Sequence, residues 1–170
     1  IEYAISEGVD ILSNSWGGGP FSQALADVIE EANQAGILFV AAAGNAATNN
    51  DETPSYPSNY DNDNVVSVAA IDRSGELAGF SNYGAQSVDI GAPGVAIYSS
   101  TSDSETSYSS FNGTSMAAPH VSGVAALLLS AYPEANIAEL KNRLLITAAP
   151  LVALSGKVAT GGMVDAAAGI

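Results

Sequence analysis

The sequence contains no cysteine, a single histidine and only four lysine and arginine residues among 170. Without cysteine, neither disulfides nor thiolate metal sites can support the fold. The four basic residues stand against 18 acidic ones, and the resulting net charge of −14 repels phosphate backbones and anionic lipid headgroups. We therefore expect no nucleic-acid partner and no membrane partner, and interpret the acidity as a solvated, self-repelling surface.

Long apolar runs are also absent. The longest candidate, residues 121–129, is interrupted by Ser122 and Gly123 and falls short of the about 20 residues that cross a bilayer. The chain is nevertheless 47% hydrophobic and only 13% charged, a balance typical of a globular chain whose length suits one domain. Ile1 starts inside a helical pattern with no methionine, signal peptide or cap before it, so we expect a chain cut from a longer one.

The first half of the chain has a strand–helix–strand pattern. Helical spacing over residues 21–35 ends at Gly36 and lies between apolar strands predicted at residues 9–12 and 37–42. Such a unit normally joins parallel strands, so we predict an α/β fold of three layers (α/β/α), with helices on both faces of a mostly parallel sheet. The loops at the carboxyl ends of these strands, residues 14–20 and 43–64, are then the expected site.

The second half adds further elements. Turn residues separate strands predicted at residues 65–70, 88–90 and 95–99. A long helix is predicted over residues 114–131, before Pro133, and Asn136 with Glu139 forms a capping box for a helix to about residue 147. A short Ala-rich segment at the end of the chain can form a last helix.

Residues 112–120 place a serine at the opening of the long helix, beside Gly113. The free N–H groups of a helix N-terminus can stabilise the oxyanion that forms when a serine oxygen attacks a carbonyl, and glycine lets a substrate backbone approach. Pro119 falls near the first turn, where a missing N–H costs little. Taken alone, this pattern fits equally a helix cap at Thr114 or Ser115.

The longer string, GTSMAAPHV at residues 113–121, resembles at every position the nucleophile signature of the subtilisin-like serine proteases. Three more segments resemble that family in the same order: SNSWGG at 13–18 its first substrate-binding strand, VAAAGN at 40–45 its oxyanion loop, and GAPGV at 91–95 the turn ahead of the nucleophile. With FSNYG at 80–84 and GGMVDAA at 161–167, the resemblance covers nearly the whole chain. Residues 1–170 are thus identified as the C-terminal part of a single subtilase catalytic domain, whose N-terminal part is missing.

The resemblance implies a serine endopeptidase that hydrolyses peptide bonds through an acyl-enzyme on Ser115. The Asn45 amide would donate to the oxyanion together with the Ser115 N–H. The polypeptide substrate would lie along Ser15, Trp16 and Gly17, although Trp16 could equally be a core residue. Small residues would wall a slot for large apolar or aromatic side chains: Ala42, Ala43 and Gly44.

The histidine base and the aspartate of the family's triad are missing, because neither the Asp-Thr-Gly-like nor the His-Gly-Thr-like motif occurs. The resemblance implies that His120 packs in the protein rather than serving as base. Neither Lys141 nor Lys157 has a neighbourhood that suggests a desolvated base. We therefore expect the chain alone to be inactive and the missing N-terminal part to be its partner. The alternative is a non-catalytic subtilase-like binding or structural module.

The chemistry that the resemblance implies needs no cofactor and no metal. Asp89 and the carbonyls of Ser58 and Tyr60 resemble positions that hold a weak structural cation in some relatives, which leaves a structural calcium open. Asn45 argues against the related group with a Glu–Asp–Ser triad and an aspartate at the oxyanion position. The family also implies a secreted or extracellular protein.

Overall fold

Six strands form the central sheet of the computed structural model, which describes all 170 residues. Their order is β1-β2-β3-β4-β8-β7, and only the last pair is antiparallel. The strands are β1 (Ile11–Asn14), β2 (Leu38–Ala42), β3 (Val65–Ile71), β4 (Ile90–Pro93), β8 (Gly162–Met163) and β7 (Ala149–Pro150). The predicted α/β fold with a mostly parallel sheet is confirmed.

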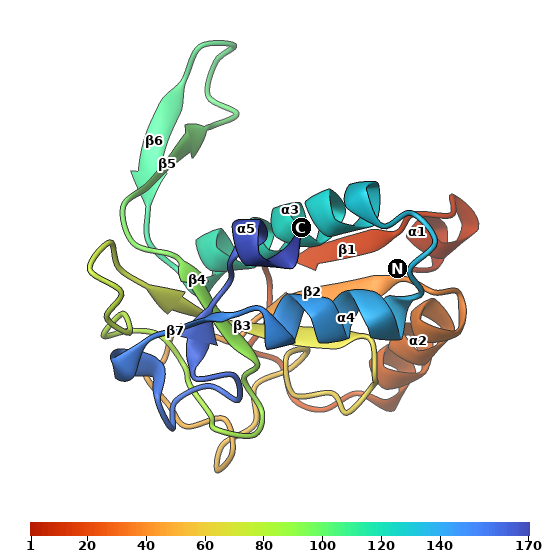
Figure 1. Cartoon of the computed structure of the whole chain (residues 1–170), viewed down its shortest axis with the longest axis horizontal. Helices are drawn as coiled ribbons and strands as arrows, with labels where there is room; N and C mark the ends of the chain where they lie inside the picture. The colour runs from red at the N-terminus through yellow and green to blue at the C-terminus, as the bar shows by residue number, and fades with distance from the viewer.

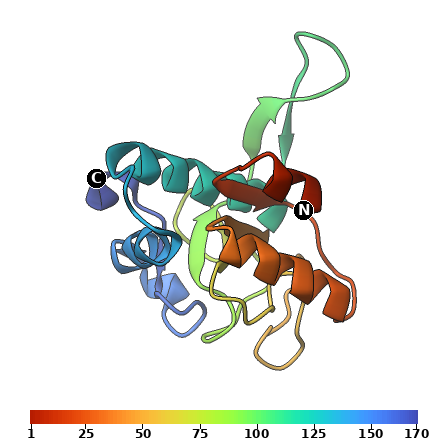
Figure 2. The same cartoon turned by 90° about the vertical axis from the view of Figure 1, so that its right-hand side faces the viewer.

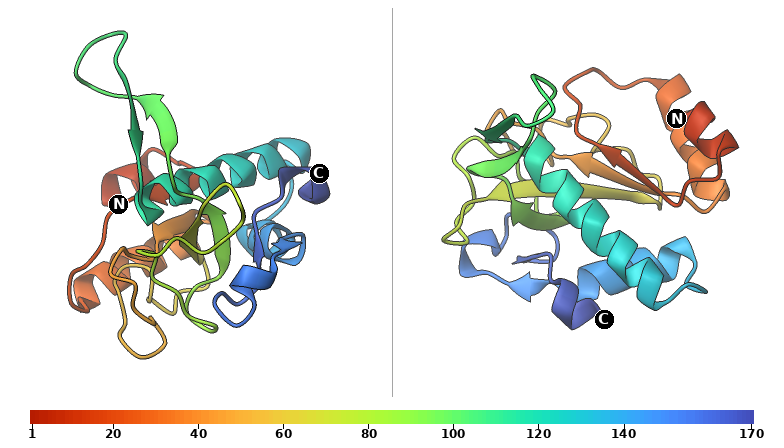
Figure 3. Two further views of the ribbon diagram at one scale, coloured as in Figure 1. Left: turned by 90° about the vertical axis from the view of Figure 1, so that its left-hand side faces the viewer. Right: turned by 90° about the horizontal axis from the view of Figure 1, so that it is seen from above.

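Helices cover both faces of this sheet (Figure 1; Figure 3). Helices α3 (Thr114–Ala131) and α4 (Ile137–Ile146) pack on one face, against side chains such as Val40 and Val66. The opposite face carries α2 (Gln23–Gln34), whose Ile29 packs on Phe39 and Val65. The short elements α1 (Glu2–Ser6), η1 (Val152–Leu154) and α5 (Ala166–Gly169) complete the layers. Because successive strand residues alternate between these clusters, the sheet is the middle layer.

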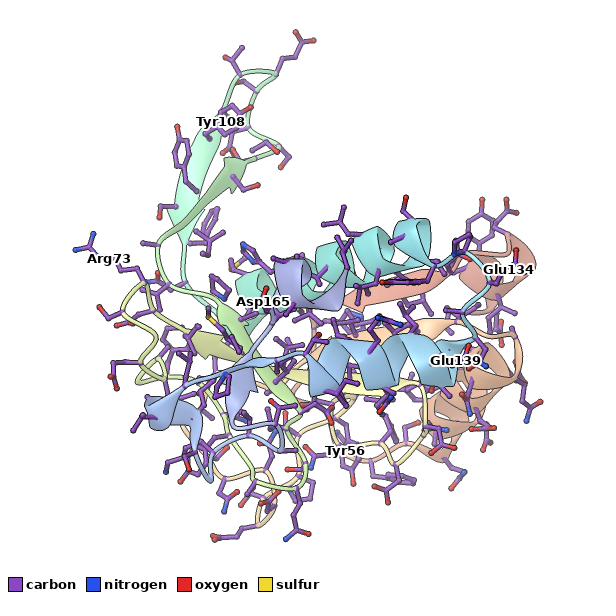
Figure 4. The ribbon with its side chains drawn as sticks, in the orientation of Figure 1. Tyr56, Arg73, Tyr108, Glu134, Glu139 and Asp165 are labelled. Atoms are coloured by element: carbon purple, nitrogen blue, oxygen red, sulfur yellow. The ribbon has the colours of Figure 1, made fainter.

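The helix boundaries follow the sequence closely. Helix α3 has the predicted bounds, and the predicted capping box opens α4: Asn136 Oδ1 accepts the Glu139 N–H at 3.0 Å, and the Glu139 carboxylate accepts the Asn136 N–H at 2.9 Å (Figure 4). The strand boundaries agree less well, since β1 and β4 each begin two residues later than predicted. Strands β7 and β8 were not predicted, because two residues each give no periodic signal.

A hairpin of β5 (Ile97–Ser100) and β6 (Tyr108–Phe111) projects away from the body (Figure 1; Figure 2). The strand predicted at residues 95–99 therefore lies in this second, two-stranded sheet and not in the core. Tyr98 and Tyr108 stack across the hairpin with ring centroids 5.4 Å apart, and Tyr98 is 71% exposed. Figure 4 shows Tyr108 on the projecting hairpin, away from the body. The hairpin thus presents aromatic surface that no other part of the chain covers.

One helix, α3, is long and apolar enough to cross a membrane by length and composition alone. Core helices pass the same test, and α3 contacts the four strands β1 to β4. Its buried face includes Ala117, Val121 and Leu128. The buried third of α3 is therefore explained by packing on the sheet.

Candidate active site

Ser115 is the second residue of α3 and faces the end of β1. Its Oγ donates to the carbonyl oxygen of Ser15 at 3.0 Å, and the Ser15 Oγ donates back to the carbonyl oxygen of Ser115 at 2.7 Å. The second bond exists because Pro119, one turn later, has no N–H to offer the Ser115 carbonyl. The two serines, 100 residues apart in sequence, therefore fix each other's backbone.

Asn45 lies beside them in the loop that follows β2. Its Oδ1 accepts the Thr114 N–H at 2.8 Å and the Thr114 hydroxyl at 3.0 Å. Thr114 is fully buried, and its Oγ1 also accepts the Gly44 N–H at 3.2 Å. Because Thr114 occupies the oxygen of the Asn45 amide, the Nδ2 group is left to donate elsewhere. Sequence reasoning considered Thr114 only as a helix cap, because its partner lies 69 residues away.

Two N–H donors converge beside Gly113, which has φ +155°. A Cβ built on Gly113 would lie 3.6 Å from the Ser115 nitrogen and 3.7 Å from Asn45 Nδ2. Because Ser115 is the second residue of α3, no carbonyl oxygen of the helix can accept a hydrogen bond from its N–H group. The two nitrogens thus border one space beside Gly113, and a negatively charged oxygen placed there could accept hydrogen bonds from both.

A cleft of about 410 Å³ opens in front of these donors. Its lining includes Ser115 and Asn45 and five of the six residues predicted to contact substrate: Ser15, Trp16, Gly17, Ala42 and Gly44. Trp16 is 48% exposed and donates from Nε1 to Asn14 Oδ1 at 3.2 Å, so it is a wall of the cleft and not a core residue. Ala43 is the exception. Its side chain points to the opposite side and packs with Ala69 and Ile71, because neighbouring residues of an extended chain face opposite ways.

A second cleft of about 680 Å³ lies between the β5–β6 hairpin and the start of α3. Ser115 lines this cleft as well, together with Met116, His120 and Phe111. The expectation that His120 packs inside the protein is wrong for this chain: the residue is exposed, because the side of α3 that carries it borders this open cleft. Its Nδ1 lies 2.8 Å from the Met116 carbonyl oxygen, one turn back on the same helix.

No group that could act as base contacts the Ser115 hydroxyl. Its hydrogen-bond partner is the Ser15 carbonyl, and the only histidine is engaged with Met116. Lys141 donates to the Asp63 carbonyl oxygen at 2.9 Å, and Lys157 Nζ lies 4.2 Å from the centroid of the Tyr83 ring. Within these 170 residues, therefore, no histidine or lysine side chain is placed to accept a proton from the Ser115 hydroxyl.

The residues considered for a cation do share a pocket, of about 210 Å³. Asp89 and residues 58–60 line it together with Lys141. The Asp89 carboxylate already accepts the Ser67 N–H at 2.7 Å, and burial raises the pKa of the Asp89 carboxyl above its ordinary value. No three His, Cys, Asp or Glu side chains, here or elsewhere in the chain, lie close enough together to hold a metal ion. Asp61 and Asp63 also line this pocket, but the Asp89 carboxylate is engaged and the Lys141 ammonium already places a positive charge there, which disfavours a calcium ion.

Comparison with known proteins shows the family of this chain. The model of the subtilase family, Peptidase S8, matches residues 1–169. The chain belongs to the subtilase family. It is 45% identical over 152 residues to subtilisin DY of Bacillus licheniformis, which covers 89% of this chain and 54% of that protein. It is 41% identical over 149 residues to subtilisin E of Bacillus subtilis, covering 87% of this chain and 38% of that protein.

A solved structure of a protease from Pseudoalteromonas arctica superposes with a TM-score of 0.84 at 35% identity. The match covers 95% of this subtilase chain and 50% of the solved one. The chain thus spans about half the length of the relatives that it matches, with the subtilase fold shown for that half.

Proposed function

We propose that this chain supplies the nucleophile and the oxyanion site of a serine endopeptidase. Ser115 attacks the carbonyl carbon of a peptide bond and forms the acyl-enzyme, while the Ser115 N–H and Asn45 Nδ2 donate to the oxyanion of the tetrahedral intermediate. The observation that carries this proposal is the convergence of those two nitrogens on the space beside Gly113. The relatives named as subtilisins and proteases support it.

The two clefts favour a polypeptide substrate. Ser115 lines both, so an extended chain bound in one can continue into the other with its scissile bond at the hydroxyl. The smaller cleft has small residues and Trp16 on its walls, which favours large apolar or aromatic side chains before the scissile bond. No metal or cofactor takes part in the steps proposed here. In view of its relatives we also propose that the protein is secreted.

Proton transfer requires a partner segment. The Ser115 hydroxyl needs a histidine oriented by an aspartate, and we propose that the N-terminal part of the catalytic domain brings both. Two exposed features suit such a partner: β1 is the edge strand of the sheet, and the hairpin exposes Tyr98, Tyr108 and Phe111. An open strand edge and exposed aromatic side chains are surfaces that other segments usually cover.

The test is hydrolysis of a peptide with an aromatic residue before the scissile bond, by the longer protein that contains this chain. We expect Ser115→Ala to abolish hydrolysis and Asn45→Ala to lower kcat by about 10²–10³-fold, a range known from subtilisin itself. Wild-type hydrolysis that survives Ser115→Ala would remove the proposal. A protein that folds and binds the peptide without cleaving it would support the alternative, a non-catalytic binding module. For the 170-residue chain alone, this alternative is favoured by the hydrogen bond from the Ser115 hydroxyl to the Ser15 carbonyl oxygen.

A further inference from the structure

Asn82 is a buried asparagine, 2% exposed, whose side chain has its hydrogen-bonding capacity filled by one loop. Its Oδ1 accepts the N–H groups of Ala46 at 2.8 Å and Thr48 at 3.3 Å. Its Nδ2 donates to the Ala43 carbonyl oxygen at 3.1 Å and to Asn50 Oδ1 at 2.9 Å. All four partners belong to residues 43–50, the segment that carries Asn45.

The backbone of residues 80–82 also forms hydrogen bonds with residues 43–50. The Asn82 N–H donates to the Gly44 carbonyl oxygen at 2.9 Å, and the Ala47 N–H donates to the Phe80 carbonyl oxygen at 2.9 Å. The loop needs such support because Ala47 has φ +55°, a left-handed conformation that is unfavourable for residues other than glycine. Gly44 has φ +115°, and a Cβ there would collide with the Asn82 amide. The backbone conformation of residues 43–50 thus depends on contacts with Asn82.

Asn82 holds the chain on both sides of Asn45. Its backbone N–H binds the carbonyl of Gly44, directly before Asn45, and its side chain binds the N–H of Ala46, directly after it. Given the proposed function, on which this step rests, we propose that Asn82 is a positioning residue for the oxyanion site. It fixes the backbone of Asn45 so that Oδ1 meets Thr114 and Nδ2 faces the space beside Gly113.

A buried asparagine could also matter only for stability, and Asn64 is the matched control for that role. Asn64 is fully buried, and its Nδ2 donates to the carbonyl oxygens of Ile29 at 3.3 Å and Ile37 at 2.9 Å. It has no hydrogen bond to residues 43–50. We expect both Asn82→Ala and Asn64→Ala to lower the melting temperature of the protein, and only Asn82→Ala to lower the catalytic rate.

The kinetic test uses the longer protease that contains this chain. Displacement of a catalytic group by about 1 Å can lower the rate about 10²-fold. For Asn82→Ala we expect kcat to fall by about 10–10²-fold with KM changed less than about threefold, since the oxyanion forms only after substrate binds. Asn64→Ala should retain the wild-type kcat.

A double-mutant cycle separates positioning from general damage. If Asn82 acts through Asn45, then adding Asn82→Ala to Asn45→Ala should lower kcat no further, whereas independent effects would multiply. A multiplied loss, or a kcat of Asn82→Ala equal to that of Asn64→Ala, would overturn the proposal.

Hydrogen exchange on this 170-residue chain gives a readout that needs no hydrolysis. The Thr114 N–H is protected by Asn45 Oδ1, so we expect its exchange to become faster in Asn82→Ala and to stay unchanged in Asn64→Ala. If Asn82→Ala fails to fold, Asn82→Asp replaces it, because that variant keeps the size and the acceptor but loses the Nδ2 donor. Unchanged Thr114 exchange in a folded Asn82 variant would contradict the positioning role. An inactive wild-type protease would instead remove only the proposed function.

Discussion

Ser15 and Ser115 are joined by two hydrogen bonds, each from the hydroxyl of one serine to the carbonyl oxygen of the other. This pair connects the end of β1 to the first turn of α3, where Ser115 lies. It depends on Pro119, which leaves the Ser115 carbonyl without the N–H that a helix would otherwise supply.

Removal of the Ser15 hydroxyl should therefore leave the Ser115 carbonyl without a protein donor. We expect Ser15→Ala to lower the free energy of unfolding by about 1 kcal/mol, the usual contribution of one hydrogen bond. In a Pro119→Ala background the helix regains an N–H for that carbonyl, so the same substitution should cost less. Denaturant unfolding of the four variants measures the difference, and equal losses in both backgrounds would show that the hydroxyl does not replace the missing N–H.

Thr114 should control the orientation of the Asn45 amide. Thr114→Val removes the hydroxyl that binds Asn45 Oδ1 and the acceptor for the Gly44 N–H, in a fully buried position. We expect a loss of about 1–3 kcal/mol in unfolding free energy, because a buried donor is left unpaired. Thr114→Ser keeps the hydroxyl and serves as control. A Val variant as stable as the Ser variant would show that the hydroxyl carries none of this stability.

The acid sensitivity of the fold should depend in part on Asp51, whose carboxylate binds Gln86 and Ser87. Partial burial acts to raise the pKa of Asp51, but the Ser87 hydroxyl and N–H and the Gln86 N–H outweigh it and hold the pKa below the ordinary value of 3.8. A pKa lowered by folding means that the ionised carboxylate stabilises the fold at neutral pH, and that this contribution is lost as pH falls from about 4 through the lowered pKa.

Asp51→Asn should therefore be less stable than wild type at pH 7, by less than about 1 kcal/mol because the group is exposed to solvent. The difference should shrink below pH 4 and vanish once Asp51 is protonated. Urea unfolding at pH 7, 4 and 2.5 measures it. A difference that stays constant with pH would exclude the charge as its cause.

Calcium should have little effect on the stability of this chain. The Lys141 ammonium shares the polar pocket with Asp89 and already donates to the Asp63 carbonyl oxygen. We expect millimolar calcium to leave the melting temperature unchanged in wild type and to raise it in Lys141→Met, in which the internal cation is absent. A clear rise in the wild-type melting temperature would show that the pocket binds calcium despite Lys141.

The local features of the site follow from the sequence. The opening of α3 is predictable because a Gly-Thr-Ser string precedes one apolar run, and the start of α4 because Asn136 and Glu139 stand three residues apart. What the sequence does not reveal depends on tertiary contacts. Asn82 acts on partners 32 to 39 residues away, the direction of Ala43 depends on strand register, and the exposure of His120 depends on what covers α3.

Strand β6 of the hairpin also could not be predicted from the sequence pattern. Residues 99–110 are mostly serine, threonine and acidic residues, so β6 has no apolar alternation that would mark a strand. Its pairing with β5 is decided by the backbone and by the stacked Tyr98 and Tyr108.

The central claim is that Ser115 is a nucleophile whose base lies outside these 170 residues. Reaction with a fluorophosphonate, followed by intact mass and peptide mapping, tests it most directly, because the reagent forms a stable bond only with an activated serine. We predict no labelling of the isolated chain above that of Ser115→Ala, and complete labelling at Ser115 in the longer protease. Labelling of Ser115 in the isolated chain would contradict the claim, since the chain would then contain its own base.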